Sequence, residues 1–319
     1  MKKNFLYFAF AALAAMCMTA CGDDSNDDNG GSNNPQQPQN NVTLTAPKYA
    51  DQAVRFELKE PIEATSDDAT LQLKAVNFTE GGKAILEMYN PVTQKRSYVA
   101  ETATISGNDY HISGSKASGT ITKLQNAKAR ATRATSNVQL SLSLTIMGYT
   151  YSIDADSPAD AVEKAKSMGG GAILGYIART WNVLGYILDL KGSDIKAVAS
   201  KEFKTLTAVR DQAIESGCGL TDEELADFKD ISSVVIDATG LIAINYTDGS
   251  VDAGNWDWAN TQYNRFTLRL EEGMGNKFIA NNTNIDVAFN GNRCNLKLST
   301  SITGDKNYDV VLLMQLQAE

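Results

Sequence analysis

The stretch Val138-Gln-Leu-Ser-Leu-Ser-Leu-Thr-Ile146 decides the fold class of this 319-residue chain, because apolar and polar side chains alternate along it. Successive side chains of a β-strand point to opposite faces, so this alternation is typical of a strand with one buried face. Similar short runs, separated by Gly, Asn, Asp and Pro, follow one another from Pro47 to Asp154. Strands spaced by about 8–12 residues with turn residues between them predict an antiparallel sandwich or barrel.

A short helix is predicted where this first series of strands ends. Ser157-Pro158 with Asp160 is typical of a helix start, since serine caps the first turn and proline fits it, and Gly169-Gly-Gly171 is typical of a helix end. The helix and its glycines therefore mark a boundary between two domains. The predicted division is a signal peptide at 1–20, a tether at 21–45, a β domain at 46–156, a linker helix and Gly turn at 157–175 and a second β domain at 176–319.

The second domain is predicted to be β with a helical insertion. The apolar stretch Ala172–Leu190 favours a long or bent strand, because polar residues and a glycine interrupt it. Residues 193–229 predict two helices, one capped by Ser193 and one opened by a capping box of Thr221 and Glu224. The predicted fold is mainly β: two antiparallel β-meander barrel or sandwich domains, the second with a two-helix insertion.

A short internal repeat links the two domains. The aligned runs are Val76-Asn-Phe78, Gly82 and Ala84-Ile-Leu86 in the first, and Val234-Val-Ile236, Gly240 and Ile242-Ala-Ile244 in the second. Both runs are patterns of strand, tight turn and strand. Either a duplicated domain or ordinary hairpin chemistry explains the match.

The N-terminal segment is typical of a bacterial export signal. Lys2 and Lys3 precede an apolar run, Phe5–Met16, that is too short for a permanent membrane span. The run Met18-Thr-Ala-Cys21 resembles the lipobox of bacterial lipoproteins, in which the cysteine is diacylated on sulfur and becomes the new N-terminus. The resemblance implies a stable lipid anchor on Cys21, since two or three acyl chains hold a protein where one does not. The alternative is an ordinary secretory signal with an incidental cysteine.

The segment at 21–45 is predicted to be a disordered acidic tether. Behind Cys21 it contains four aspartates, no Lys or Arg and almost nothing apolar before Val42, so it cannot bury enough surface to offset ordering. Acidic residues directly behind a lipidated cysteine resemble the export signal of Bacteroidetes lipoproteins that reach the outer face of the outer membrane. We therefore expect an outer-membrane lipoprotein facing the cell surface, with a periplasm-facing anchor as the alternative.

The charge balance argues against nucleic acid as a partner. Removing Lys2 and Lys3 with the signal leaves 27 basic against 38 acidic residues, a formal charge of −11. A negative field of this size repels a phosphate backbone and disfavours anionic ligands unless a local basic patch overrides it. The body is therefore expected to stay at the membrane through its lipid and not through its charge.

Two cysteines remain in the body of the protein. Cys17 leaves with the signal and Cys21 is lipidated, which leaves Cys218 and Cys294. An isolated pair outside the cytoplasm is a disulfide candidate. Two separate buried thiols are the alternative.

The second domain resembles a known family. Thr180-Trp-Asn-Val183, then Val234-Val-Ile-Asp-Ala-Thr-Gly240 and Gly254-Asn-Trp-Asp-Trp258, resemble the Gly-Thr-Trp-like first strand and later Gly-x-Trp strand of lipocalin-like domains in Bacteroidetes lipoproteins. The resemblance covers residues 176–319, with a weaker echo in 46–156. It departs from the family where Ala178-Arg179 stands in place of the expected glycine and in the long helical insertion. It implies a β-meander barrel with a cavity but names no ligand.

Aromatic residues of the second domain are the candidate ligand-binding residues. They are Trp181, Tyr246, Trp256, Trp258 and Tyr263. Trp256 and Trp258 share one face of a predicted strand, where their indoles could stack on a sugar ring or an apolar ligand. If that face points into the core, the same side chains are packing residues, which is the interpretation favoured for large aromatics.

No catalytic residue, metal site or cofactor is predicted. His111 is the only histidine and lies in a predicted strand, and the chain has no G-x-S-x-G, P-loop, HExxH or CxxC pair. Asp252 and Asp257 have the residue type that glycoside hydrolysis uses, but such pairs recur by chance among 38 acidic residues.

The expected function is a non-catalytic binding or accessory module for a small apolar or glycan ligand. The alternative is a structural or adhesive surface protein that contacts other proteins, and a glycan-degrading enzyme is the third hypothesis. A barrel with a cavity of several hundred Å³ favours ligand binding, whereas a filled core with an open sheet edge favours protein contact.

Overall fold

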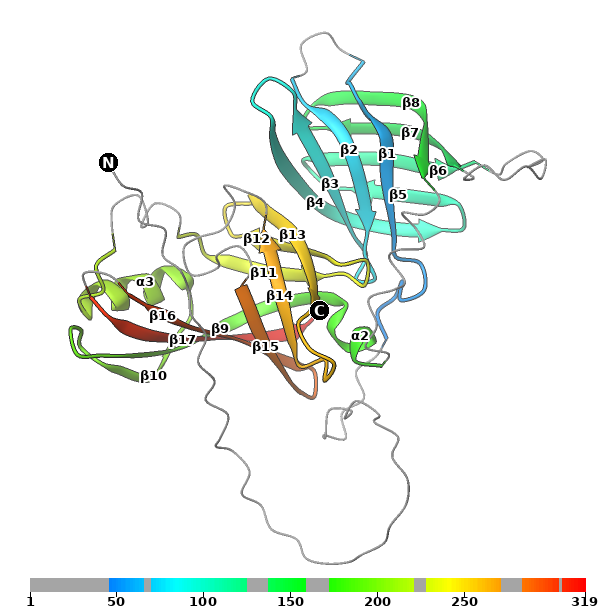
Figure 1. The fold of residues 1–319 in the computed structure, drawn as a ribbon. Coiled ribbons are helices and arrows are strands. Elements are labelled where there is room, and N and C mark those ends of the chain that lie inside the picture. The colour runs from blue at the N-terminus through cyan, green and yellow to red at the C-terminus, as the bar shows by residue number, and fades with distance from the viewer. Residues whose placement is uncertain are drawn as a thin grey trace, which may run out of the picture.

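The computed structural model describes residues 46–65, 70–124, 137–158, 172–220, 228–270, 283–303 and 306–319. The predicted signal peptide, Cys21, the tether and the helix predicted from Thr221 lie outside these residues. Most of the described chain lies in two antiparallel sheets, each rolled into a barrel (Figure 1). The prediction of a mainly β chain with two antiparallel β domains is confirmed.

The first sheet, here called barrel 1, is a simple meander. Its eight strands in the described residues lie in chain order, each paired with its sequence neighbours. They are β1 (Val54–Ile62), β2 (Gln72–Phe78), β3 (Lys83–Asn90), β4 (Lys95–Ser106), β5 (Asp109–Ser113), β6 (Ala117–Lys123), β7 (Asn137–Ile146) and β8 (Tyr149–Pro158). The alternating stretch is β7, whose Leu140, Leu142 and Leu144 are buried in the core of barrel 1.

The helix start predicted at Ser157-Pro158 is wrong, because both residues end β8. This strand pairs with β7 along its whole length, from Tyr149 opposite Ile146 to Pro158 opposite Asn137. Ser157 is fully buried in this arrangement. The strand pairing overrides the local preference for a helix cap, and proline is tolerated at the end of a strand.

The second sheet, barrel 2, is also antiparallel, but its first two strands are exchanged in the strand order, and the others follow in chain order. Its strands are β9 (Arg179–Gly192), β10 (Val198–Phe203), β11 (Ile231–Ile236), β12 (Leu241–Tyr246), β13 (Val251–Trp258), β14 (Arg265–Leu270), β15 (Thr283–Asn290), β16 (Arg293–Ile302) and β17 (Tyr308–Ala318). β17 pairs with β9 from Tyr308 opposite Gly192 to Ala318 opposite Trp181, and this closes the barrel. The other edge of β9 pairs with β11 near its start and with β10 near its end.

Two local predictions in this domain are corrected. The stretch Ala172–Leu190 is not one strand, because helix α2 (Ala172–Ile177) precedes β9 and accepts the Trp181 indole N–H at the carbonyl of Ile177. The first helix of the insertion starts later than predicted. β10 takes up the unpaired edge of β9, and helix α3 (Leu206–Glu215) begins after Thr205, whose hydroxyl accepts from the N–H of Ala208 at 3.1 Å. Among the described residues, neither helix has the length and apolar character needed to cross a bilayer.

The two barrels contact each other through the hairpins that the sequence repeat aligned. The hairpin β2–β3 contributes Ile85, and the hairpin β11–β12 contributes Val235, Leu241 and Ala243, to one small apolar cluster that spans both barrels. Both hairpins turn in the same way, with Gly82 and Gly240 at φ of 74° and 89°. These left-handed conformations favour glycine, which accounts for its place in both runs. Equivalent segments of the two domains therefore meet face to face.

Candidate functional site

The predicted aromatic residues of barrel 2 are mostly core residues. Trp181 is fully buried, packs near Phe289 with ring centroids 6.1 Å apart, and carries the guanidinium of Arg179 over its ring at 5.6 Å. Its indole N–H is held by helix α2. Trp181 is thus fixed at the start of β9 as a packing residue.

Trp256, Trp258 and Tyr263 form a stack that leads from the core outward. Trp256 is 1% exposed and donates its indole N–H to the carbonyl of Asp237 at 2.9 Å. Trp258 meets it edge-on at 5.1 Å, and Tyr263 meets Trp258 at 5.5 Å. The two tryptophans do share one face of β13, as predicted, and Trp256 on that face lies in the core.

Tyr246 is separate from this stack. It is 5% exposed, and its hydroxyl donates to Asp252 at 2.8 Å. Burial raises the pKa of the Tyr246 phenol, with the Asp252 carboxylate as a second cause. The five aromatic residues therefore do not converge on one ligand, and their buried members fill the barrel with side chains.

Cys218 and Cys294 are both free, buried thiols in the structure, so the candidate disulfide is not formed. Burial raises the pKa of both thiols. A thiol of raised pKa is a poor nucleophile and a poor metal ligand, because the thiolate is the reactive form. The arrangement is that of two separate packing residues.

The residues whose side chains could act in catalysis are also apart from one another. His111 is exposed, and its Nδ1 lies 3.0 Å from the Thr120 hydroxyl on the neighbouring strand. Asp252 holds Tyr246, whereas Asp257 is exposed on the other face of β13 from Trp256. In the described part of the chain, no three His, Cys, Asp or Glu side chains are grouped as a metal site requires.

The most distinctive feature is a seam in barrel 1 between its first and last strands. No ladder of backbone hydrogen bonds joins β1 to β8 in the described residues. β1 nevertheless lies near β8, and just beyond β1 the N–H of Thr65 donates to the carbonyl of Thr150 at 2.8 Å. Barrel 2 differs, because its corresponding strands β9 and β17 pair almost fully.

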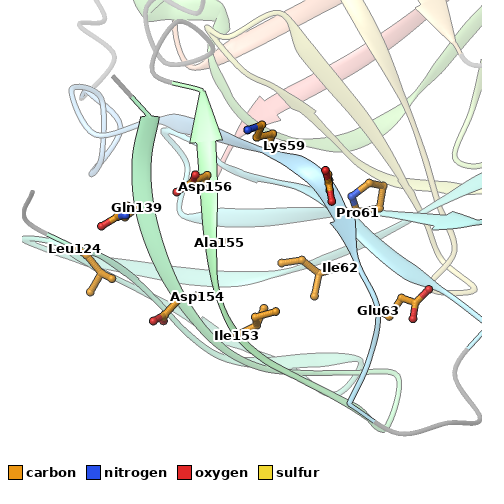
Figure 2. A pocket seen from close by; sticks show the side chains of 11 residues that line it. Lys59, Pro61, Ile62, Glu63, Leu124, Gln139, Ile153, Asp154, Ala155 and Asp156 are labelled. Atoms are coloured by element: carbon orange, nitrogen blue, oxygen red, sulfur yellow. The ribbon is translucent and has the colours of Figure 1, made fainter. Parts of the chain in front are cut away.

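A groove of about 580 Å³ lies along this seam. Its lining residues come from β1, β7 and β8 and from the residues directly after β1 and β6: Lys59, Glu60, Pro61, Ile62, Glu63, Leu124, Gln139, Ile153, Asp154, Ala155 and Asp156. Figure 2 shows Ile62 of β1 and Ile153 of β8 in the space between the two strands. The groove thus has an apolar floor and four carboxylates against one lysine.

An irregularity in β1 accounts for the seam. The pairing of β1 with β2 runs regularly from Val54 to Glu57 and resumes only at Ile62, opposite Leu73. The intervening residues bulge, and Pro61 has no N–H to donate. β1 likewise forms no backbone ladder with β8 in the described residues.

The exposure of Ile153 is a consequence of this opening. Ile153 lies on the same face of β8 as the buried Tyr151 and Ser157, yet 49% of it is exposed. A side chain that points toward the core is exposed here, at the edge of β8 that no strand pairs with in the described residues. The sequence analysis missed this site, although the alternation from Tyr149 to Ile153 could have identified β8.

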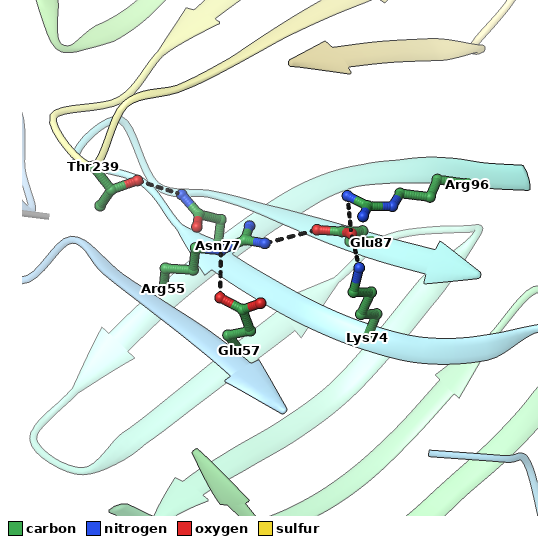
Figure 3. A network of polar contacts seen from close by, with 7 residues as sticks. All are labelled: Arg55, Glu57, Lys74, Asn77, Glu87, Arg96 and Thr239. Carbon is green, nitrogen blue, oxygen red and sulfur yellow. Dashed lines mark hydrogen bonds and ion pairs between the residues drawn. The ribbon is translucent and has the colours of Figure 1, made fainter. Parts of the chain in front are cut away.

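A second polar site lies between the barrels. Asn77, which is fully buried, donates its side-chain amide to Asp237 at 3.2 Å and to the Thr239 hydroxyl at 3.1 Å. The Oε1 atom of Glu80 accepts the N–H of Ala238 at 3.2 Å. These bonds cross from β2–β3 to the turn of β11–β12, as Figure 3 shows for Asn77 and Thr239.

Burial controls the protonation of this site. It raises the pKa of Glu80 to about 9, and the Asp237 charge adds to the effect. Burial likewise raises the pKa of Asp237 to about 6, against the hydrogen bonds from Thr239 and Asn77. At neutral pH the Glu80 carboxyl is therefore protonated and Asp237 carries the charge.

A cation cluster lies beside it on the outer face of barrel 1. Glu87, whose side chain is 3% exposed, is bonded by Arg55 at 2.7 Å and lies 2.9 Å from Arg96 and 3.6 Å from Lys74 (Figure 3). Three cations around one buried carboxylate compensate its charge and tie together β1 to β4. This cluster is a structural network.

No protein-family model matches the sequence, and comparisons with curated proteins and with solved structures found no significant match.

Proposed function

We propose that this chain is a lipid-anchored, non-catalytic protein of the cell envelope that binds a protein partner through the seam of barrel 1. The observation that carries the proposal is the groove of about 580 Å³ between two sheet edges that do not pair. An open sheet edge is a template for another chain, and natural proteins normally cover it.

The packing of barrel 2 favours this function over a lipocalin-like ligand carrier. Trp181 and Trp256, the residues that the resemblance places in the two signature strands, are 0% and 1% exposed. Their indole N–H groups already donate hydrogen bonds to backbone carbonyls. A side chain packed and bonded in this way contributes to stability and offers no face to a ligand.

The two barrels together suit a presenting role. The contact between hairpins β2–β3 and β11–β12, with its apolar cluster and buried hydrogen bonds, supports one body made of both barrels. Lipidation of Cys21 and the acidic tether would hold that body near, but not against, an anionic membrane surface. Barrel 2 and the anchor would then position barrel 1 for its partner.

Site-specific photo-crosslinking in intact producing cells tests this function. A photoreactive amino acid replaces Ile153 in the groove or, as the matched control, Val92, which is 84% exposed on a turn of the same barrel. We expect a discrete protein adduct from position 153 and none from position 92. Equal labelling from both positions, or no adduct from 153, contradicts the proposal.

The same cells test the anchor. In a Cys21→Ala variant we expect the protein to leave the membrane fraction, with a corresponding loss of the adduct at position 153. Retention of the variant in the membrane fraction contradicts lipid anchoring but leaves the seam as a contact site.

A further inference from the structure

The seam has a defined backbone side, which the hydrogen bond of Thr150 identifies. In an antiparallel strand, the N–H and C=O of one residue point to the same side, and the sides alternate along the chain. The Thr150 carbonyl accepts from Thr65 across the seam, so Thr150 faces the seam and not β7. The backbone groups of Ser152, Asp154 and Asp156 therefore face the groove as well.

The neighbouring strand gives the same assignment independently. The carbonyl of Gln139 on β7 accepts from the N–H of Leu124, so Gln139 faces β6. Gln139 lies opposite Asp156, and the backbone groups of such a pair both point away from the β7–β8 ladder. β8 thus presents a regular sheet edge along the groove.

The side chains around this edge are sorted by face. On the inner face, Ile153, Ile62 and Ala155 form an apolar surface. On the outer face, Asp154 and Asp156 follow one another on β8. The exposed carboxylates of Glu60, on β1, and Glu63, directly after β1, also line the groove.

We propose, building on the function above, that the groove binds an extended protein segment in which basic and apolar residues alternate, by adding it as a strand to the edge of β8. The backbone of the segment pairs with the groove-facing groups of β8. Its apolar side chains cover Ile153, and its Lys or Arg side chains meet the outer carboxylates. Strand addition of this kind draws affinity from backbone bonds and specificity from alternate side chains.

The wall Ile153–Asp156 sets the length of the segment. Four residues at about 3.3 Å each span about 13 Å, so about four to five partner residues fit along it. β1 contributes less, because Pro61 lacks an N–H and the strand bulges there. The added strand therefore pairs with β8 and is only flanked by β1.

Fluorescence anisotropy with a defined probe tests the proposal. The probe is a fluorescein-labelled octapeptide of alternating Lys and Val, and the protein is the body without its signal and lipid, residues 22–319. We expect saturable binding that weakens as salt rises. A peptide of the same composition with its lysines and valines in two blocks, and one with Glu in place of Lys, should each bind at least tenfold more weakly.

Two substitutions of Asp154 distinguish the contribution of its side-chain charge from that of its backbone N–H. Asp154→Lys should weaken binding about 3- to 10-fold, because a rim attraction becomes a repulsion. Asp154→Pro removes a groove-facing N–H without removing a bond to β7 and should abolish most of the binding. The matched control is Asp51→Lys, the same charge change at an exposed position before the start of β1, which should bind as the parent does. Circular dichroism and the thermal midpoint verify that each variant is folded.

Several outcomes overturn the proposal. They are equal binding of the alternating and blocked peptides, unchanged binding by Asp154→Pro, and concentration-dependent dimers whose formation the peptide blocks, which would make a second copy the occupant. Binding that appears only after Lys128, Arg130 and Arg133 are replaced by Ser would make residues 125–136 of the same chain the occupant. If the peptide fails while position 153 still crosslinks to a protein in cells, the strand-addition mode is wrong and the proposed function stands.

Discussion

Replacing Glu80 by Gln should remove a specific pH dependence from the stability of the protein. Glu80 is 3% exposed at the contact between the barrels, and burial raises its pKa from 4.5 to about 9. Because the folded pKa lies above the unfolded one, the folded state holds a proton that the unfolded state releases. The stabilisation by Glu80 is complete below pH 4.5 and is lost as the pH rises toward about 9.

The size of this pH dependence follows from the one proton that the folded state binds and the unfolded state releases. Between the Asp237 pKa of about 6 and the Glu80 pKa of about 9, the native protein retains one more proton on Glu80 than the unfolded chain. One proton corresponds to about 1.4 kcal/mol of unfolding free energy per pH unit. Gln imitates the protonated carboxyl and keeps an oxygen to accept the N–H of Ala238. From pH 6 to pH 8, Glu80→Gln should therefore gain about 3 kcal/mol relative to the parent.

The assay is urea unfolding of both proteins at half-unit steps of pH, with the difference in unfolding free energy plotted against pH. Subtraction cancels the titration of the carboxylates that do not interact with Glu80. Glu202→Gln, on the exposed strand β10, is the control and should give a flat difference. Parallel curves for the parent and Glu80→Gln would contradict this prediction, since they would mean that Glu80 is ionised in the folded protein.

Three further predictions concern the packing of the barrels. Asn77→Ala removes the amide that bonds the turn of the opposite barrel and should lower the unfolding free energy by about 2–3 kcal/mol, measured in urea. Trp256→Phe leaves a buried carbonyl without its donor and should destabilise more than Trp258→Phe, whose indole N–H has no partner in the described residues, as thermal melts would register. Cys218 and Cys294 should resist a thiol reagent in the folded protein and react only after denaturation, which a colorimetric titration follows.

Each of these three predictions has a result that would contradict it, and the first also has a matched control. Asn90→Ala, where the amide oxygen bonds two backbone N–H groups on an exposed turn, should cost less than the buried substitution. An equal loss for both Asn variants would argue against the inter-barrel bonds. Equal melting of the two Trp variants would argue against the indole bond, and rapid labelling of either thiol in the native protein would argue against its burial.

The fold class could be predicted because it depends on local alternation. The strand predicted at Ile242-Ala-Ile244 lies within β12, and the stretch Val138–Ile146 lies within β7. Turn glycines such as Gly82 and Gly240 can also be predicted from the sequence, since the φ angles of these turns favour glycine. The helix start that was predicted wrongly also depended on a local pattern. Ser157 has the residue type of a helix N-cap, but its pairing with β7 places it in a strand.

The seam could not be predicted, because it depends on the distance between strands far apart in the sequence. A bulge after Glu57 and the register of β8 against β7 together determine it. No single pattern of residues in the sequence indicates both the bulge and the register. The resemblance to lipocalin-like domains directed attention to the tryptophans of barrel 2, whereas the candidate contact site lies in barrel 1.

Amide hydrogen exchange along β8, read residue by residue by NMR, tests most directly whether the seam is open. The structure predicts alternating protection: rapid exchange at Ser152 and Asp154, which face the groove, and slow exchange at Ile153, which pairs with Leu142 of β7. The internal reference is β17, paired on both sides, where consecutive residues such as Leu312 and Leu313 should both exchange slowly. Uniformly slow exchange along β8 would mean that barrel 1 is closed, and the account of this protein as a seam-binding module would be wrong.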